Sequence, residues 1–304
     1  MINYYFILYL FRCTECSLVN LPTYSCINNS CVEPISPDSI PLPAFRRIIW
    51  TYWDSGIENA PPVIKPCIDS WKRLNPTWSV TVLNQESVKL LLPELWESLL
   101  NKYILPSTQQ TDFIRLLLLQ KYGGVWIDAT VYCQKPLDDW LGIAMKDSSF
   151  FYFRNPNSVH GICTWFIAVN NTENKHINSW FQVLKARFLQ IVSISNEISY
   201  FLIMEVHGIL MKSEPSFARA STAMTWMFAT WGDIGPHYAQ ILGLDNIVSP
   251  ADKEILLNNN ITYLHKLNWR IWATAPESVL QVIISQGDID NFDPGDEIRA
   301  ELKN

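Results

Sequence analysis

The stretch from Thr111 to Pro136 constrains the fold of this chain more than any other. Apolar spacing over residues 108–122 predicts a helix with Thr108 as its cap, and Gly123-Gly124 is typical of a helix end. The short apolar run from Val125 to Cys133 then predicts a strand. A helix and a strand that are both this apolar must be largely buried, so they predict a helix packed on a central sheet.

The rest of the chain repeats this alternation of strands and helices. Strands are predicted at 46–53 and 78–83, and helical stretches at 63–73 and 85–100, the second interrupted by Pro93. From about residue 148, short strands alternate with helices, among them 177–191 and 198–211. This order predicts an α/β fold with a mostly parallel central sheet flanked by helices.

Composition and proline content define the domain organisation. The 304 residues, 48% of them hydrophobic, are enough for a sizeable core. We expect residues 1–43 to form an irregular segment with a proline-rich linker, and 44–304 to form one domain with halves at 44–147 and 148–304. The apolar run 2–11 is too short to span a bilayer. The early cysteines allow a zinc knuckle, but their spacing without histidine fits one poorly; they are Cys13, Cys16, Cys26 and Cys31.

The acidic charge of the chain argues against nucleic acid as a partner and limits the size of a phosphate-bearing ligand. The net charge is −6 and no basic stripe is present, which argues against nucleic-acid binding. A phosphate-bearing ligand would therefore be small and neutralised locally. Seven cysteines without regular spacing fit a cytoplasmic protein. Association with the inner face of the membrane is the alternative, although no basic amphipathic helix favours it.

Asp112 and Arg115 form a charged pair within the apolar helix. They lie three residues apart and therefore on one helix face. Buried charges need partners, so a structural ion pair is one interpretation. The other is that the pair lines a pocket, where Asp112 accepts from sugar hydroxyls and Arg115 contacts phosphate or sugar oxygens. The spacing does not choose between them.

Asp128 is out of place in a buried strand. Alternation would put it on one face with Trp126, Thr130 and Tyr132. A carboxylate there requires a metal, a cation or hydrogen-bond donors. Ligands of open α/β sheets bind beyond the carboxyl ends of the strands, near where Asp128 lies. A hard oxygen ligand at that place suits Mg²⁺ or Mn²⁺ bridging a diphosphate.

Four separated blocks in this region resemble the capsular polysaccharide synthesis protein family. They are Ile48–Trp53, Ser70-Trp71-Lys72 with Asn75-Pro76, Thr111–Arg115, and Tyr122–Thr130. They occur in order across residues 44–140, which makes the resemblance specific. That family is similar to the sugar transferases with a DxD motif, which include yeast-type α-mannosyltransferases and the glucosyltransferase domain of large clostridial toxins.

The resemblance implies a glycosyltransferase (a hexosyltransferase) with a GT-A-type fold. It implies a UDP- or GDP-sugar donor, a divalent cation (Mn²⁺ or Mg²⁺), retention of anomeric configuration, and a glycan or lipid-linked glycan acceptor in capsular or other surface polysaccharide synthesis. Asp128 and Arg115 would be the catalytic residues, and Asp128 would be the first acid of the motif. The residues expected to contact the donor are Trp50, Thr51 and Tyr52 beside the base, together with Asp112, Arg115, Trp126 and Lys266.

Thr130 departs from the wider pattern, which has a second acid at this position. A threonine hydroxyl is a weaker, neutral metal ligand, although the Asp-x-Thr form looks usual for the capsular branch. Asp138 and Asp139 are nearby alternatives.

Two later blocks resemble C-terminal parts of these transferases, Gly235-Pro236-His237 and His265-Lys266-Leu267. His265 would then complete the metal site with Asp128 and Thr130, and Lys266 would neutralise phosphate. The alternative is that His265 only ends a strand. Trp269 and Trp272 are candidates to cover donor or acceptor, or to pack in the core.

Three other functions fit parts of this pattern. Thr130 and the unusual amino terminus motivate a degenerate protein that binds sugar nucleotide or glycan without transfer. A hydrolase or phosphatase could use the same carboxylate and metal. A purely structural assembly protein would bind no donor.

Overall fold

The computed structural model describes residues 26–27, 30–31, 46–155, 158–172, 174–195, 197–230 and 234–286. Its centre is a five-stranded sheet with the order β4-β3-β5-β8-β7. Strands β4, β3 and β5 are parallel, β8 is antiparallel to β5, and β7 is antiparallel to β8. Four of the five strands therefore run in one direction. The strands are β3 (Ile48–Tyr52), β4 (Ser79–Leu83), β5 (Gly124–Ile127), β7 (Phe150–Asn155) and β8 (Gly161–Val169).

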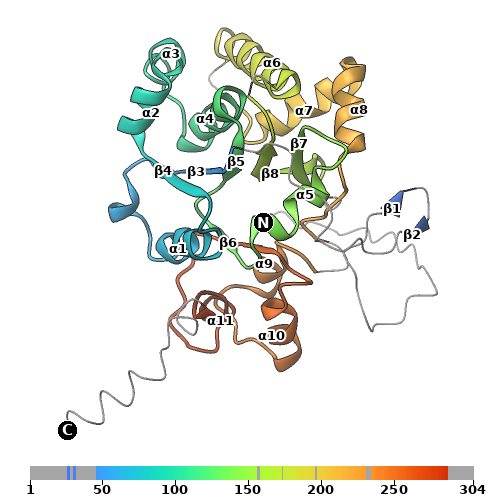
Figure 1. Cartoon of the computed structure of the whole chain (residues 1–304). Coiled ribbons are helices and arrows are strands. Elements are labelled where there is room, and N and C mark those ends of the chain that lie inside the picture. Colours follow the sequence, from blue (N-terminus) through green and yellow to red (C-terminus); the bar gives the residue numbers. More distant parts are fainter. Residues whose placement is uncertain are drawn as a thin grey trace, which may run out of the picture.

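Helices cover both faces of this sheet, so the predicted α/β architecture with a mostly parallel central sheet is confirmed (Figure 1). Helices α4, α6, α7 and α8 lie on one side, and α1, α9, α10 and α11 lie on the other. The longer helices are α1 (Ile64–Leu74), α2 (Gln85–Leu91), α4 (Ser107–Tyr122), α6 (Lys175–Val192), α7 (Leu202–Ser213), α8 (Pro215–Ala223) and α10 (Pro250–Leu257). The shorter helical segments are η2 (Ile57–Asn59), α3 (Pro93–Leu95), η3 (Trp96–Leu100), η4 (Leu137–Asp139), α5 (Leu141–Ala144), α9 (Tyr238–Leu242) and α11 (Val279–Ile284).

Helix α4 is the buried helix that the sequence predicts. It ends at Gly123, whose φ of 64° lies in the left-handed region that glycine tolerates. Gly124 follows with φ 89°, and a Cβ there would meet the Ile48 carbonyl oxygen at 2.5 Å. The predicted Thr108 cap is wrong, because the helix begins at Ser107 and the Thr108 hydroxyl donates to the neighbouring Gln109 side chain.

The predicted strand 125–133 is two strands, not one. Strand β5 ends at Ile127, and the Val131 amide donates to the Asp128 carbonyl oxygen at 2.9 Å, which closes a turn. The chain then continues as β6 (Val131–Cys133), which pairs antiparallel with β9 (Leu264–Lys266) in a separate small sheet. Asp128 and Thr130 therefore do not lie on one face of a continuous strand, as the alternation predicted. Both belong to the turn that follows the end of β5.

The two predicted halves of the domain share one sheet, since β5 from the first half pairs with β8 from the second. Upstream, only the backbone of a short hairpin is described, β1 (Cys26–Ile27) paired antiparallel with β2 (Ser30–Cys31). Cys13 and Cys16, on which a zinc knuckle would depend, and the apolar run 2–11 lie outside the described residues. None of the described helices is long and apolar enough to cross a membrane.

Candidate active site

Asp128 lies at the carboxyl edge of the central sheet. Strands β3, β4 and β5 are parallel, so their carboxyl ends meet at this edge, where ligands bind in open α/β sheets. The Asp128 amide donates to the Trp165 carbonyl oxygen of β8 at 2.8 Å, which fixes the backbone of the turn. Its side chain is 28% exposed, so the carboxylate is accessible to a ligand from one side.

Two cations and an indole hold the Asp128 carboxylate. Arg115 Nη2 lies 3.4 Å from Oδ1, and Lys266 Nζ lies 3.4 Å from Oδ2. Trp126 Nε1 donates to Oδ1 at 3.1 Å. Burial raises the pKa of Asp128, but Arg115, Lys266 and Trp126 together outweigh it, and the pKa falls below its ordinary value. Asp128 is therefore an anion at neutral pH.

Arg115 reaches from α4 to this carboxylate and is itself fixed on several sides. Nη1 donates to the Thr164 carbonyl oxygen at 2.7 Å, and Nη2 lies 3.3 Å from Asp112 Oδ1. The guanidinium carbon is 5.4 Å from the centre of the Trp126 ring. The Asp112–Arg115 ion pair is thus present, and the same arginine also reaches Asp128, so the two interpretations of this pair are compatible.

Asp112 makes the charge of the cluster depend on pH. Burial, together with the nearby Asp128, raises its pKa to about 7 against the opposing effect of Arg115. At neutral pH, Asp112 is therefore partly protonated. Two cations then face one full and one partial negative charge, and the excess positive charge favours an anionic ligand.

Lys266 comes to the site through the small sheet. It pairs with Val131 across the β6–β9 ladder, and the Leu267 amide donates to the Thr130 carbonyl oxygen at 2.8 Å. Lys266 Nζ donates to Thr130 Oγ1 at 2.5 Å, and its side chain is 17% exposed. A residue far along the chain thereby becomes a neighbour of the Asp128 turn.

The expectation that His265 completes a metal site with Asp128 and Thr130 is wrong, because its side chain does not lie beside Asp128. Successive strand side chains point to opposite faces, so Lys266 and His265 cannot both reach Asp128. His265 is fully buried, and its Nε2 contacts Gln134 Oε1 and, at 3.0 Å, the Leu256 carbonyl oxygen. Burial lowers its pKa to about 4. His265 is therefore a buried structural residue, and it lies in the middle of β9 rather than at the strand end that the alternative expected.

The described side chains do not fit a resident divalent cation. Within the described ranges, no three histidine, cysteine or carboxylate side chains come close enough to hold a metal. Asp128 offers one carboxylate, and the Thr130 hydroxyl already accepts from Lys266. Asp138 is engaged by Arg47 at 2.7 Å and by Trp78 at 3.0 Å. At phosphate sites Mg²⁺ and Mn²⁺ take one or two carboxylates and complete their oxygen shell with waters and substrate phosphates, so without a diphosphate this turn does not supply enough oxygen ligands to hold either ion as a resident.

The three residues expected beside the base are buried in strand β3. Trp50 donates from Nε1 to the Gly123 carbonyl oxygen at 3.0 Å, and Thr51 is fully buried. Tyr52 is only 7% exposed, and their contact with a donor stays a prediction. The next residue, Trp53, makes an edge contact with Trp269, with ring centres 6.0 Å apart, and Trp269 is 42% exposed. This pair offers a more accessible aromatic surface near the carboxyl end of β3.

His237 is a site residue that the sequence prediction did not include. Its Nε2 accepts from Trp165 Nε1 at 3.0 Å, and the adjacent Pro236 carbonyl oxygen accepts from the Lys266 amide at 2.7 Å. Burial and, to a lesser extent, the nearby Lys266 lower the pKa of His237 to about 4, so the ring is neutral. In the sequence, the Gly235-Pro236-His237 block was the signal that could have pointed to His237. The hydrogen bond from the Lys266 amide of β9 to Pro236 shows that this block belongs to the Asp128 site.

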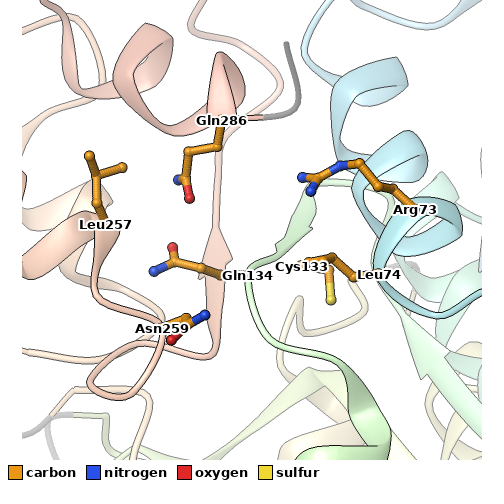
Figure 2. Close-up of a pocket in the computed structure, with 7 residues that line it drawn as sticks. All are labelled: Arg73, Leu74, Cys133, Gln134, Leu257, Asn259 and Gln286. Atoms are coloured by element: carbon orange, nitrogen blue, oxygen red, sulfur yellow. The ribbon is translucent and has the colours of Figure 1, made fainter. Parts of the chain in front are cut away.

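A separate pocket lies beside the Cys133 end of β6 (Figure 2). None of its lining residues belongs to the Asp128 cluster: Cys133 is the last residue of β6 and Gln134 follows it, whereas Thr130 precedes the first residue of the strand. The side chains that line it are Arg73, Leu74, Cys133, Gln134, Leu257, Asn259 and Gln286.

Curated relatives with similar sequences carry glycosyltransferase names. The O-glycosyltransferase PaGT of Phomopsis amygdali is 31% identical over 148 residues, 42% of this chain and 36% of that protein. The initiation-specific alpha-1,6-mannosyltransferase of Candida albicans is 30% identical over 104 residues, 32% of this chain and 27% of that protein. The matched stretch thus spans well under half of each relative's length.

Solved structures add little to this assignment. The glycosyltransferase GlyE of Streptococcus pneumoniae aligns with a TM-score of 0.46 and 11% identity, covering 80% of this chain and 60% of that one. A likeness at this level carries no argument about function. The sequence profile of one family, by contrast, matches residues 34–280, most of the chain. The chain belongs to the capsular polysaccharide synthesis protein family.

Proposed function

We propose that this chain is a glycosyltransferase that moves a sugar from a nucleoside-diphosphate sugar to a glycan acceptor. The observation that carries the proposal is the Asp128 carboxylate held between Arg115 and Lys266 at the carboxyl edge of the sheet. This edge is where α/β sheets bind ligands, and the excess positive charge suits a diphosphate. The family and the names of the relatives support the same reaction class.

The chemistry follows from the charge of the leaving group. When the bond between sugar C1 and the phosphate oxygen breaks, its electron pair stays on the diphosphate. Fixed cations that stabilise this developing charge lower the barrier. Arg115 and Lys266 are the described cations at the site, and Asp128 holds both while its exposed side can accept from donor hydroxyls.

The finer parts of this function stay predictions. Transfer with retention of anomeric configuration would need no obligatory protein base. His237 beside the cluster is neutral, and this mechanism assigns it no role as a base. We propose a cytoplasmic role in capsular or surface polysaccharide synthesis, with UDP- or GDP-sugar as the donor. The Trp53–Trp269 pair is our candidate for the base-binding surface. The divalent cation that the resemblance implies would compete with the Lys266 ammonium group for the same place.

The proposal predicts turnover of a particular nucleotide sugar. Purified chain is incubated with a panel of UDP- and GDP-sugars, and release of the nucleoside diphosphate is measured with and without oligosaccharide acceptors. We expect one donor to be consumed, and an acceptor to raise the rate. Free sugar released at an undiminished rate with no acceptor effect would indicate a hydrolase. Donor binding without turnover of any sugar would indicate a binding protein.

A further inference from the structure

We propose that the ammonium group of Lys266 is the resident cation of this site and takes the place of a divalent metal at the donor diphosphate. The inference rests on the proposed function, which supplies the diphosphate. It predicts that donor binding and sugar transfer proceed without added metal. Its basis is the position of Nζ and the contacts that fix that position.

Lys266 Nζ lies between the side chains of the two motif positions. It is 3.4 Å from Asp128 Oδ2 and donates to Thr130 Oγ1 at 2.5 Å. A cation that bridged these two positions would occupy the same place. One carboxylate and one hydroxyl match the single charge of an ammonium group better than the charge of a divalent ion. Threonine in place of a second acid is therefore consistent with a lysine at this point.

The ammonium group retains capacity for a ligand. It carries three N–H donors, and Asp128 and Thr130 account for two of them. No third partner of Nζ is found among the described residues. The side chain is 17% exposed, so a phosphate oxygen can approach the remaining donor. An N–H donor aimed at a phosphate oxygen forms a strong, charge-assisted hydrogen bond.

The backbone on both sides of Lys266 is anchored. Its amide donates to the Pro236 carbonyl oxygen at 2.7 Å, and the Leu267 amide donates to the Thr130 carbonyl oxygen at 2.8 Å. The β6–β9 ladder places Lys266 opposite Val131. These contacts hold the lysine where the charge develops, and such preorganised charge contributes most to transition-state stabilisation. A flexible surface lysine would lack this advantage.

The reaction balances without a metal. The bond between sugar C1 and the phosphate oxygen breaks, and its electron pair stays on that oxygen. A new bond forms from C1 to the acceptor oxygen, whose proton passes to the departing phosphate oxygen or to water. Lys266 donates a hydrogen bond to the diphosphate and keeps its proton throughout. Arg115 provides a second fixed positive charge nearby.

Binding measurements test the inference without requiring turnover. Calorimetry with UDP and GDP is performed in EDTA and then in Mn²⁺. We expect the Kd of the preferred nucleotide to change by less than about threefold between the two conditions, and Lys266→Met to weaken it about tenfold to a hundredfold in EDTA. Lys266→Arg keeps the charge and should retain most of the affinity, while Lys65→Met alters only an exposed lysine of α1. Unchanged affinity in Lys266→Met, with native melting behaviour, would overturn the assignment.

A double variant designed to replace the Lys266 ammonium group by a bound Mn²⁺ tests the inference more sharply than the calorimetry. In the double variant Thr130→Asp with Lys266→Ala, a second acid replaces the threonine and the ammonium group is removed. We expect the wild type to turn over its donor in EDTA, and the double variant to do so only with Mn²⁺. A wild type that is inactive in EDTA and restored by Mn²⁺ would contradict the inference while leaving the proposed function intact. No turnover of any donor under either condition would instead count against the proposed function, and the calorimetry would still decide the role of Lys266.

Discussion

Asp128→Asn is expected to lower kcat/KM for the donor by about a hundredfold to a thousandfold. The substitution keeps the size of the side chain but removes the charge that holds Arg115 and Lys266 on its two oxygens. The asparagine amide group would also point N–H donors at one of these cations. Both cations would lose their fixed positions, and the exposed side of the carboxylate could no longer accept in the same way. Steady-state kinetics with the donor identified from the panel measures the effect.

The matched control is Asp147→Asn. Asp147 is an exposed carboxylate whose ion pair with Lys146 spans 3.8 Å, so the same chemical change there should leave kcat/KM within about twofold. Thermal melting of both variants separates loss of activity from loss of fold. If Asp128→Asn melts like the wild type and retains wild-type kcat/KM, the role assigned to this carboxylate is wrong.

Gly124→Ala is expected to destabilise the protein by more than about 3 kcal/mol, enough to prevent folding of a marginally stable chain. Its φ of 89° is strained for any residue with a Cβ, and that atom would lie 2.5 Å from the Ile48 carbonyl oxygen. Relief would require β3 and β5 to separate where they pair, beside the end of α4. The free energy of unfolding, measured by urea titration, gives the magnitude.

Two other glycines separate the two causes of this destabilisation, the positive φ and the steric clash of the added Cβ. Gly161 has φ 67°, but a Cβ added there would have no neighbour within 4 Å, so Gly161→Ala should show only the conformational cost of about 1–2 kcal/mol. Gly208 lies within α7 with open space around it, and Gly208→Ala should be neutral or stabilise by up to about 1 kcal/mol. A Gly124→Ala variant as stable as Gly208→Ala would refute the close approach of β5 to β3.

The first half of the sheet could be predicted from the sequence because its signals are local. Apolar runs bounded by polar or glycine residues locate β3 and β4, and the apolar pattern ending at Gly123 locates α4. Within that framework, the helix spacing of Asp112 and Arg115 pointed to the ion pair that the structure contains. Asp128 was conspicuous because a buried strand does not accommodate an unpartnered carboxylate.

The remaining site features depend on contacts between distant segments. The break between β5 and β6 is decided by the pairing of β6 with β9, more than a hundred residues later, and no local pattern marks it. The same register decides that Lys266 faces Asp128 while His265 is buried on the other side. A shift of one residue would exchange the two, so spacing alone could not choose between them. His237 joins the site because its loop is bound to Lys266 through Pro236 and its ring accepts from Trp165, two contacts between segments far apart in the sequence.

The most direct test of the central claim is a crystal structure of the protein with its preferred nucleoside diphosphate bound. We expect the diphosphate to lie at the carboxyl edge of the sheet, with a phosphate oxygen accepting from Lys266 Nζ beside Asp128 and Thr130. A nucleotide bound instead in the pocket between Arg73 and Gln134, without contact to the Asp128 turn, would contradict it (Figure 2).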